Sequence, residues 1–177
     1  MTTHFANLRH NISAFVPSFV DGRPLTKLRR IMSKGTQPVL EAKKLPDTVD
    51  AVAPNGSEIR LLAVSGRGSM VHCTLPPGAT SKAIKHRAVE ELWYFISGAG
   101  RVWRKLGDRE EIVDVEPGWS LSIPTGASFQ FQNSGDRPLC FVIVTIPPWP
   151  GEGEAIPQPG YWDHDTGLSS SEPTPLH

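Results

Sequence analysis

The sequence predicts an all-β protein, a sandwich or a barrel, and three observations support that prediction. The chain has 177 residues, which is enough for one domain with its own core and not comfortably for two. Its 17 prolines and 16 glycines are scattered along the sequence, a pattern that favours short strands joined by tight turns. Short apolar-rich runs recur between turn residues about every 8–12 positions, and no segment has a convincing amphipathic helical pattern. We therefore expect about eight strands.

The turn residues set the order of the expected strands. Asn55-Gly56 marks an early turn, and glycine-containing turns follow at residues 65–68 and 97–100. Later breaks contain Gly107-Asp108 and Pro117-Gly118. The main strands expected between these breaks are residues 58–64, 69–75, 91–96, 101–105, 111–115 and 139–146.

The overall charge limits the kinds of partner. The chain has 18 basic and 18 acidic residues, so no net field draws it to nucleic acid or to an anionic membrane surface. No apolar run approaches the roughly 20 residues that span a bilayer. We expect a soluble, cytoplasmic protein whose partner is a small molecule, with neither nucleic acid nor a membrane as a partner.

The N-terminal region differs from the rest in charge. Residues 1–31 contain five basic residues and one acidic residue. A basic, acid-poor leader is typical of an organelle transit peptide, and targeting is therefore the alternative to a cytoplasmic location. The favoured interpretation is a loosely ordered extension over residues 1–37, followed by the barrel domain over residues 38–150.

Residues 151–177 form a tail rich in proline and glycine. From Pro147 the chain has five prolines before position 160 and then the aromatic pair Tyr161-Trp162. This composition predicts no regular secondary structure. We expect an extended course across the barrel or a neighbouring subunit, with Trp149, Tyr161 and Trp162 as anchors, and a disordered end over residues 167–177.

One segment has the spacing of half a metal site. Gly78 is followed by five residues, then Ile84-Lys85-His86, four residues, Glu91, six residues and Gly98. A histidine and a carboxylate are ligands for divalent ions and also form acid–base pairs. The segment therefore raises the question of further ligands elsewhere in the chain.

A second segment has a related pattern. Gly118 is followed by five residues, then Pro124-Thr125-Gly126, two residues, Phe129, three residues and Asn133. Together the two segments resemble, spacing for spacing, the two sequence motifs of the cupin family. The resemblance covers about residues 55–148 and implies a double-stranded β-helix, a barrel of the jelly-roll kind. It also implies a homodimer, the frequent state of cupins.

The departures from the family pattern bear on the metal. In metal-binding cupins two histidines and a glutamate of the first motif and a histidine of the second hold one divalent ion. Here Ile84 and Phe129 stand at two of those positions, so His86 and Glu91 remain. Two ligands beside apolar walls bind an ion weakly, since the walls penalise a poorly compensated charge. The expected cofactor is none, or a weakly held divalent ion such as iron, manganese, nickel or zinc.

Two further histidines could complete a ligand set. His72 lies on the strand before the first motif, where alternation puts it and Cys73 on opposite faces. The sequence leaves open which of the two points into the barrel. His164 lies in the tail and could fold over the mouth of the barrel. With either residue, the alternative of an ion held by His86, Glu91 and a recruited ligand stays open.

Strand alternation also predicts a pocket. Ile84 and His86 share a face of one strand, and Glu91, Trp93 and Phe95 share a face of the next strand. If these faces look inward, as in cupins, they enclose aromatic walls around the candidate pair His86 and Glu91. The predicted pocket residues are Ile84, Trp93, Phe95, Phe129, Phe131 and His72. Alternatively, the pair simply satisfies itself by hydrogen bonding in a closed core.

Three functions follow from different classes, and whether the protein is an enzyme stays open. The first is a cupin that binds a small molecule without chemistry. The second is a metal-independent isomerase, epimerase or cyclase that uses His86 and Glu91 as acid and base. The third is a metal-dependent dioxygenase or decarboxylase with a reduced or recruited ligand set. Fold alone does not choose among them.

Overall fold

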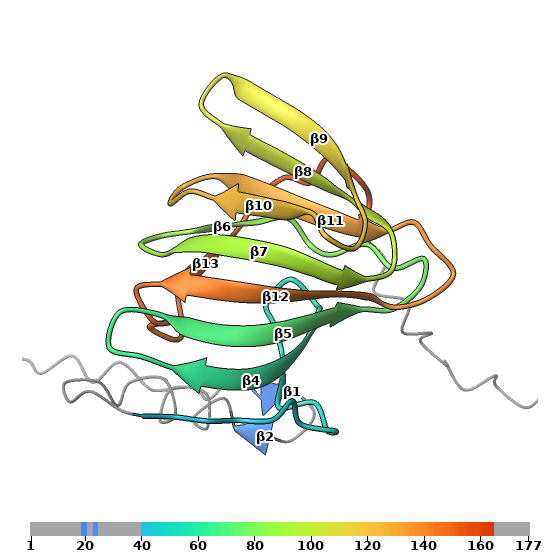
Figure 1. Ribbon diagram of the computed structural model, residues 1–177. Helices are drawn as coiled ribbons and strands as arrows, with labels where there is room; N and C mark the ends of the chain where they lie inside the picture. The colour runs from blue at the N-terminus through green and yellow to red at the C-terminus, as the bar shows by residue number, and fades with distance from the viewer. Residues whose placement is uncertain (1–18, 21–22, 25–39, 165–177) are drawn as a thin grey trace, which may run out of the picture.

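The computed structural model describes residues 19–20, 23–24 and 40–164, and every regular element in these ranges is a β-strand (Figure 1). The all-β prediction is therefore confirmed. No helix in these ranges is long and apolar enough to cross a membrane. The strands are β1 Phe19–Val20, β2 Arg23–Pro24, β3 Ala51–Val52, β4 Glu58–Val64, β5 Ser69–Leu75, β6 Ile84–His86, β7 Glu90–Ser97, β8 Gly100–Leu106, β9 Arg109–Val115, β10 Ser120–Ile123, β11 Ser128–Asn133, β12 Leu139–Ile146 and β13 Ala155–Pro157.

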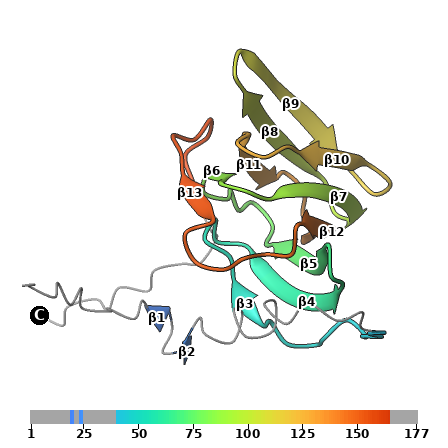
Figure 2. The same ribbon diagram turned by 90° about the vertical axis from the view of Figure 1, so that its left-hand side faces the viewer.

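Two antiparallel sheets form the body of the protein. The six-stranded sheet has the order β10-β7-β12-β5-β4-β3, and the five-stranded sheet has the order β13-β6-β11-β8-β9. The chain crosses between the sheets repeatedly, so neighbours in a sheet are mostly distant in sequence, as in a jelly roll. Figure 2 shows the hairpin of β8 and β9 projecting beyond the other strands.

Strand alternation places the core between the sheets. In β7 the buried residues alternate with exposed ones along the whole strand, as expected for a strand with one face on the core. Trp93 and Phe95 of β7 meet Phe141 of β12, each with ring centroids 4.8 Å from that ring. Phe131 of β11 reaches the same ring from the other sheet at 5.3 Å. Burial of each such side chain contributes about 1.5–3 kcal/mol.

Two residues of the sequence motifs have structural roles. Gly98 has φ +80°, and a Cβ there would lie 2.5 Å from the carbonyl oxygen of Pro138, so the position requires glycine. The buried amide of Asn133 donates to the carbonyl oxygens of Leu75 and Arg137, both at 2.9 Å. Asn133 therefore ties the loop before β12 to the end of β5.

The tail is more ordered than the sequence predicts. Ala155–Pro157 forms β13 and pairs with β6, so the prediction of no regular secondary structure is wrong for these residues, and the five-stranded sheet extends past residue 150. Pro157 fits because β13 is an edge strand, where a missing N–H costs little.

Farther along the tail, aromatic residues lie on the outer face of the five-stranded sheet. Tyr161 stacks on Trp103 with ring centroids 6.1 Å apart, and Arg101 lies over the ring of Trp162 at 5.2 Å. Tyr161 and Trp162 thus pack on the barrel, as expected for two of the three anchors, whereas Trp149 lies beside His86. The predicted extension over residues 1–37 lies outside the described residues apart from the short pair of β1 and β2, as does the end of the tail over 167–177.

Candidate functional site

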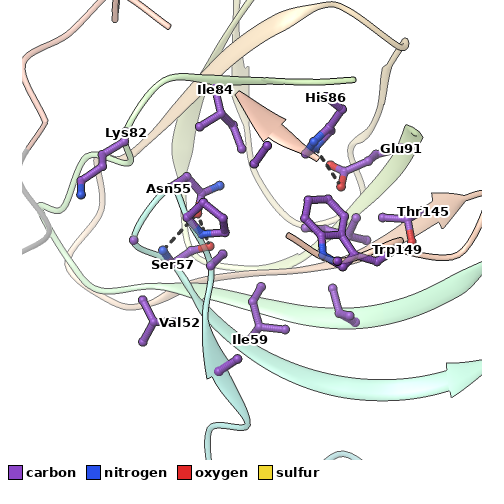
Figure 3. A pocket seen from close by; sticks show the side chains of 18 of the residues that line it. Val52, Asn55, Ser57, Ile59, Lys82, Ile84, His86, Glu91, Thr145 and Trp149 are labelled. Atoms are coloured by element: carbon purple, nitrogen blue, oxygen red, sulfur yellow. Dashed lines mark hydrogen bonds and ion pairs between the residues drawn. The ribbon is translucent and has the colours of Figure 1, made fainter. Parts of the chain in front are cut away.

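A cavity of about 500 Å³ lies between the two sheets, and residues of both sheets line it (Figure 3). Its wall combines inward side chains of the strands with residues from two further segments, residues 51–57, which run from β3 to the start of β4, and residues 149–155, which run from β12 to the start of β13. Most of the lining is apolar. The polar groups gather in two places, one around His86 and the other around Asn55.

The first motif supplies one side of the cavity. His86 is the last residue of β6, and Ile84 shares its face because side chains alternate along a strand. Phe129 of β11 is the register partner of Ile84. His86 is 3% exposed. Ile84 and Phe129, which stand where metal-binding cupins have histidines, thus lie beside His86.

Glu91 of β7 faces His86 from the other sheet. Its Oε1 lies 3.2 Å from His86 Nε2, and its Oε2 accepts a hydrogen bond of 2.7 Å from Trp93 Nε1. Both side chains of the pair are buried. Trp93 therefore fixes the carboxylate, and one oxygen stays directed at the imidazole.

Neither ring nitrogen of His86 has a hydrogen-bond partner in the described part of the chain. The approach of Glu91 to Nε2 meets an ion-pair distance, but its direction does not satisfy hydrogen-bond geometry. Phe129 and Trp149 flank the ring, with centroids at 5.1 and 5.2 Å. A buried polar group without a partner costs about 1–3 kcal/mol. The pair also borders the cavity, and Nδ1 faces no described partner, so the contact with Glu91 does not satisfy the whole ring.

The structure divides the predicted pocket residues into two groups. Ile84, Trp93 and Phe129 line the cavity. Phe95 and Phe131 do not, because they lie deeper along the barrel axis and are closed off in the aromatic core, both 0% exposed. Their assignment to the pocket was wrong, since alternation gives the face of a residue but not its depth.

His72 was also wrongly assigned to the pocket. Val71 lines the cavity and Cys73 belongs to the core, so alternation along β5 directs His72 to the opposite face of the sheet. There it pairs in register with Arg60, and its Nδ1 lies 3.4 Å from Thr74 Oγ1. Burial, followed by the nearby Arg60 guanidinium, lowers the pKa of His72.

The donor set does not fit a resident metal ion. No three His, Cys, Asp or Glu side chains come together within residues 40–164 or the two short strands before them. His72 faces away and His164 does not line the cavity, so neither supplies a third ligand to His86 and Glu91. Ile84 and Phe129 stand beside the pair and offer no donor atom.

Several lining residues come from loops and were not predicted. Trp149 covers the imidazole of His86, although the sequence suggested only an anchoring role. Asn55 and Lys82 also line the cavity, and only the turn at Asn55 had a sequence signal.

Glu154, 4% exposed, accepts the backbone N–H groups of Ala88 and Val89 at 2.7 and 2.9 Å. This carboxylate holds the segment after β12 against the turn between β6 and β7.

Comparison with known proteins agrees with this fold. Residues 71–145 match the family model described as Cupin domain. A curated relative, mannose-1-phosphate guanylyltransferase 2 of Escherichia coli O157:H7, is 30% identical over 89 residues. That alignment covers 50% of this chain and 18% of the relative, so this chain spans only a small part of that protein's length.

Solved structures show the same architecture. Oxalate decarboxylase from Bacillus subtilis, studied for its Mn(II) centres, has a TM-score of 0.50 and 22% identity, over 55% of this chain and 28% of that one. The capsular polysaccharide assembling protein CapF from Staphylococcus aureus has a TM-score of 0.51 and 18% identity, over 64% and 34% of the two chains. At such identities the likeness shows the fold alone.

Proposed function

We propose that this chain, which contains a cupin-superfamily domain, binds a small organic molecule in the cavity beside His86 and Glu91. The observation that carries the proposal is a buried histidine whose two ring nitrogens have no hydrogen-bond partner in the described residues and which lines an open cavity. A ligand that hydrogen-bonds to this ring would remove the cost of leaving it unpaired.

The cavity has the properties of a small-molecule site. Its volume of about 500 Å³ falls in the usual range of about 300–1,000 Å³ for ligand pockets. The walls are mainly apolar, with Ile59, Ile84 and Trp149 around the centre, and a few polar groups stand at fixed places. Apolar walls supply affinity, and the fixed polar groups determine orientation.

The same pair supports a second function, proton transfer without a metal. In its neutral form His86 has one ring nitrogen that accepts a proton and one that donates. The imidazole would take a proton from a C–H or O–H group of the ligand, while the Glu91 carboxylate stabilises the imidazolium. Return of that proton to another atom of the same ligand gives an isomer, with no net gain or loss of protons. Trp93 keeps the carboxylate in place throughout.

The curated relative suggests ligands to include in a screen. Its name refers to a guanylyltransferase for mannose 1-phosphate, so phosphorylated sugars and nucleotide sugars belong beside aromatic and aliphatic acids. The apolar lining favours the acids over the sugars.

A thermal-shift screen of these compounds tests the proposal. We expect at least one class to raise the melting temperature of the wild-type protein, and the rise to shrink in His86→Gln, which keeps a side chain of similar size. His72→Gln serves as the matched control, because His72 lies outside the cavity, and should keep the full response. A stabilising compound that acts equally on all three proteins would show that binding takes place elsewhere.

A further inference from the structure

The second polar group of the cavity begins with the side chain of Asn55, which is 7% exposed. Its Oδ1 accepts hydrogen bonds from Ser57 N and Ser57 Oγ, at 3.1 and 2.8 Å. These two bonds fix the amide, so its Nδ2 lies on the side away from Ser57 (Figure 3). No described residue accepts a hydrogen bond from Nδ2. The Nδ2 group of this largely buried side chain is therefore accessible from the cavity that Asn55 lines, and a bound molecule can accept a hydrogen bond from it.

Lys82 adds a positive charge at the rim on the same side of the cavity as Asn55. Its backbone N–H donates to the carbonyl oxygen of Asn55 at 2.8 Å, which joins the loop before β4 to the segment before β6. The Lys82 side chain is exposed at the rim of the cavity and makes no ion pair with the described residues. The other charged residue at the rim, Glu152, belongs to the segment after β12.

The two polar groups stand on different sides of an apolar space. In Figure 3, Lys82 and the pair of His86 and Glu91 lie on opposite sides of the cavity. Side chains of Ile59 and Ile84 lie between them. A molecule that contacts both groups must therefore have an apolar middle.

We propose that the natural ligand is an amphipathic organic anion, and that Lys82 and Asn55 bind its carboxylate or a similar oxyanion while its apolar body extends toward His86. This inference rests on the proposed function and names the chemical class of the ligand. An amide N–H and an ammonium group together match the oxygens of an anion, and charge-assisted hydrogen bonds are the stronger kind. Lys82 is thus a specificity-determining residue.

Two fluorescent probes with a shared aromatic body test this assignment. 1-Anilinonaphthalene-8-sulfonate carries an anionic group, and N-phenyl-1-naphthylamine is its neutral counterpart. We expect Lys82→Gln to lower the affinity for the anionic probe about five-fold and to leave the affinity for the neutral probe unchanged. Lys82→Arg should keep most of the affinity for the anion. Asn55→Asp keeps the acceptor for Ser57 but replaces the amide donor with a negative charge, and should weaken anion binding further.

The controls separate this subsite from general effects. Lys85→Gln removes one positive charge from the outward face of β6, away from the cavity, and should leave both affinities unchanged. Tyr94→Ser reduces the exposed apolar face of the larger sheet, where the probes could also adhere, and should preserve the effect of Lys82→Gln.

Two other outcomes would contradict the account at different levels. Equal effects of Lys82→Gln and Lys85→Gln on the anionic probe would overturn the oxyanion subsite and leave the cavity as a binding site. Failure of both probes to bind the wild-type protein would overturn the proposed function and the subsite with it.

Discussion

The pairing of His86 and Glu91 depends on two strands from different sheets. β6 ends at His86, and β7 begins one residue before Glu91, so the turn between them carries the chain from one sheet to the other. Alternation then directs both side chains inward. Trp93, two residues farther along β7, shares the face of Glu91 and reaches its carboxylate. A spacing of five residues in the sequence thus becomes a contact across the barrel.

The apolar residues Ile84 and Phe129, at two of the family's four metal-ligand positions, give the first prediction. Ile84→His together with Phe129→His restores the family's four positions, and the new side chains lie on neighbouring strands in register. We expect the double variant to bind a divalent ion such as zinc or manganese at near one equivalent, since four donors are enough for a closed site. The wild-type protein should retain far less. Elemental analysis after metal loading and desalting measures both.

The control for this prediction is the same double variant with His86→Ala, which should lose the ion. Wild-type protein that holds a full equivalent of metal, and loses it in His86→Ala, would show that His86 and Glu91 recruit ligands that the described arrangement does not bring together.

His72 gives a second prediction, on pH and stability. Its pKa is lowered by burial and by Arg60, so the unfolded chain takes up the proton first as the pH falls below about 6.5. The stability that neutral His72 contributes is therefore present above that pH and is lost as the pH falls. In His72→Gln this loss should disappear. Urea denaturation at several pH values measures it, and parallel curves for the two proteins between about pH 7 and pH 5 would contradict the prediction.

At the level of elements, one buried side chain adds a set of hydrogen bonds that hold the tail on the barrel. Gln130 of β11 is 1% exposed. Its Nε2 donates to the carbonyl oxygens of Ser81 and Trp162, at 2.8 and 2.9 Å, and its Oε1 accepts the N–H groups of Tyr161 and Trp162, both at 2.9 Å. A glutamine on the outward face of a strand thus becomes fully buried because the tail covers it.

The third prediction concerns this attachment. Gln130→Ala removes all four hydrogen bonds and should lower the free energy of unfolding by about 2–3 kcal/mol, with faster proteolysis within the tail. Gln132→Ala, on the same face of β11 with one side-chain hydrogen bond to Thr80, should cost less than about 1 kcal/mol. Equal costs, with no change in proteolysis, would mean that Gln130 does not hold the tail.

Sequence reasoning worked where the evidence was local. Turn residues and alternation predicted the strands around the two motifs, and family spacing brought His86, Glu91 and Phe129 together. Alternation did not predict how deep along the barrel axis a side chain lies, and for that reason Phe95 was assigned to the pocket although it belongs to the core. Nor did sequence reasoning predict loop residues such as Lys82, whose position depends on a hydrogen bond to Asn55 that no local pattern encodes. A short edge strand in a proline-rich tail likewise forms only because β6 is there to pair with it.

On the scale of the whole molecule, the described residues leave the outer face of the larger sheet exposed along β7. Leu92, Tyr94 and Ile96 of β7 are 52%, 54% and 46% exposed. Val142 and Val144 of β12 are their half-buried neighbours on that face. Contiguous exposed apolar surface of this kind is typical of interaction sites. The predicted homodimer stays a prediction, and this face is where we expect it to form, with the same patch on both copies.

The fourth prediction tests that dimer. Leu92→Lys combined with Tyr94→Lys places charges in the centre of the face and should convert a dimer into a monomer without loss of folding, because both side chains point outward. Sedimentation velocity at micromolar concentration gives the masses. A wild-type protein that is already monomeric would contradict the prediction.

The central claim is that His86 contacts a ligand in the cavity, and the ring nitrogens of that residue report on it directly. Long-range ¹H–¹⁵N correlation spectra of ¹⁵N-labelled protein resolve histidine ring nitrogens, and His86→Gln and His72→Gln assign the two signals. With the tightest-binding compound of the thermal-shift screen at saturation, we predict a shift of the His86 ring nitrogens and none at His72. Saturating binding that leaves the His86 nitrogens unchanged would contradict the account.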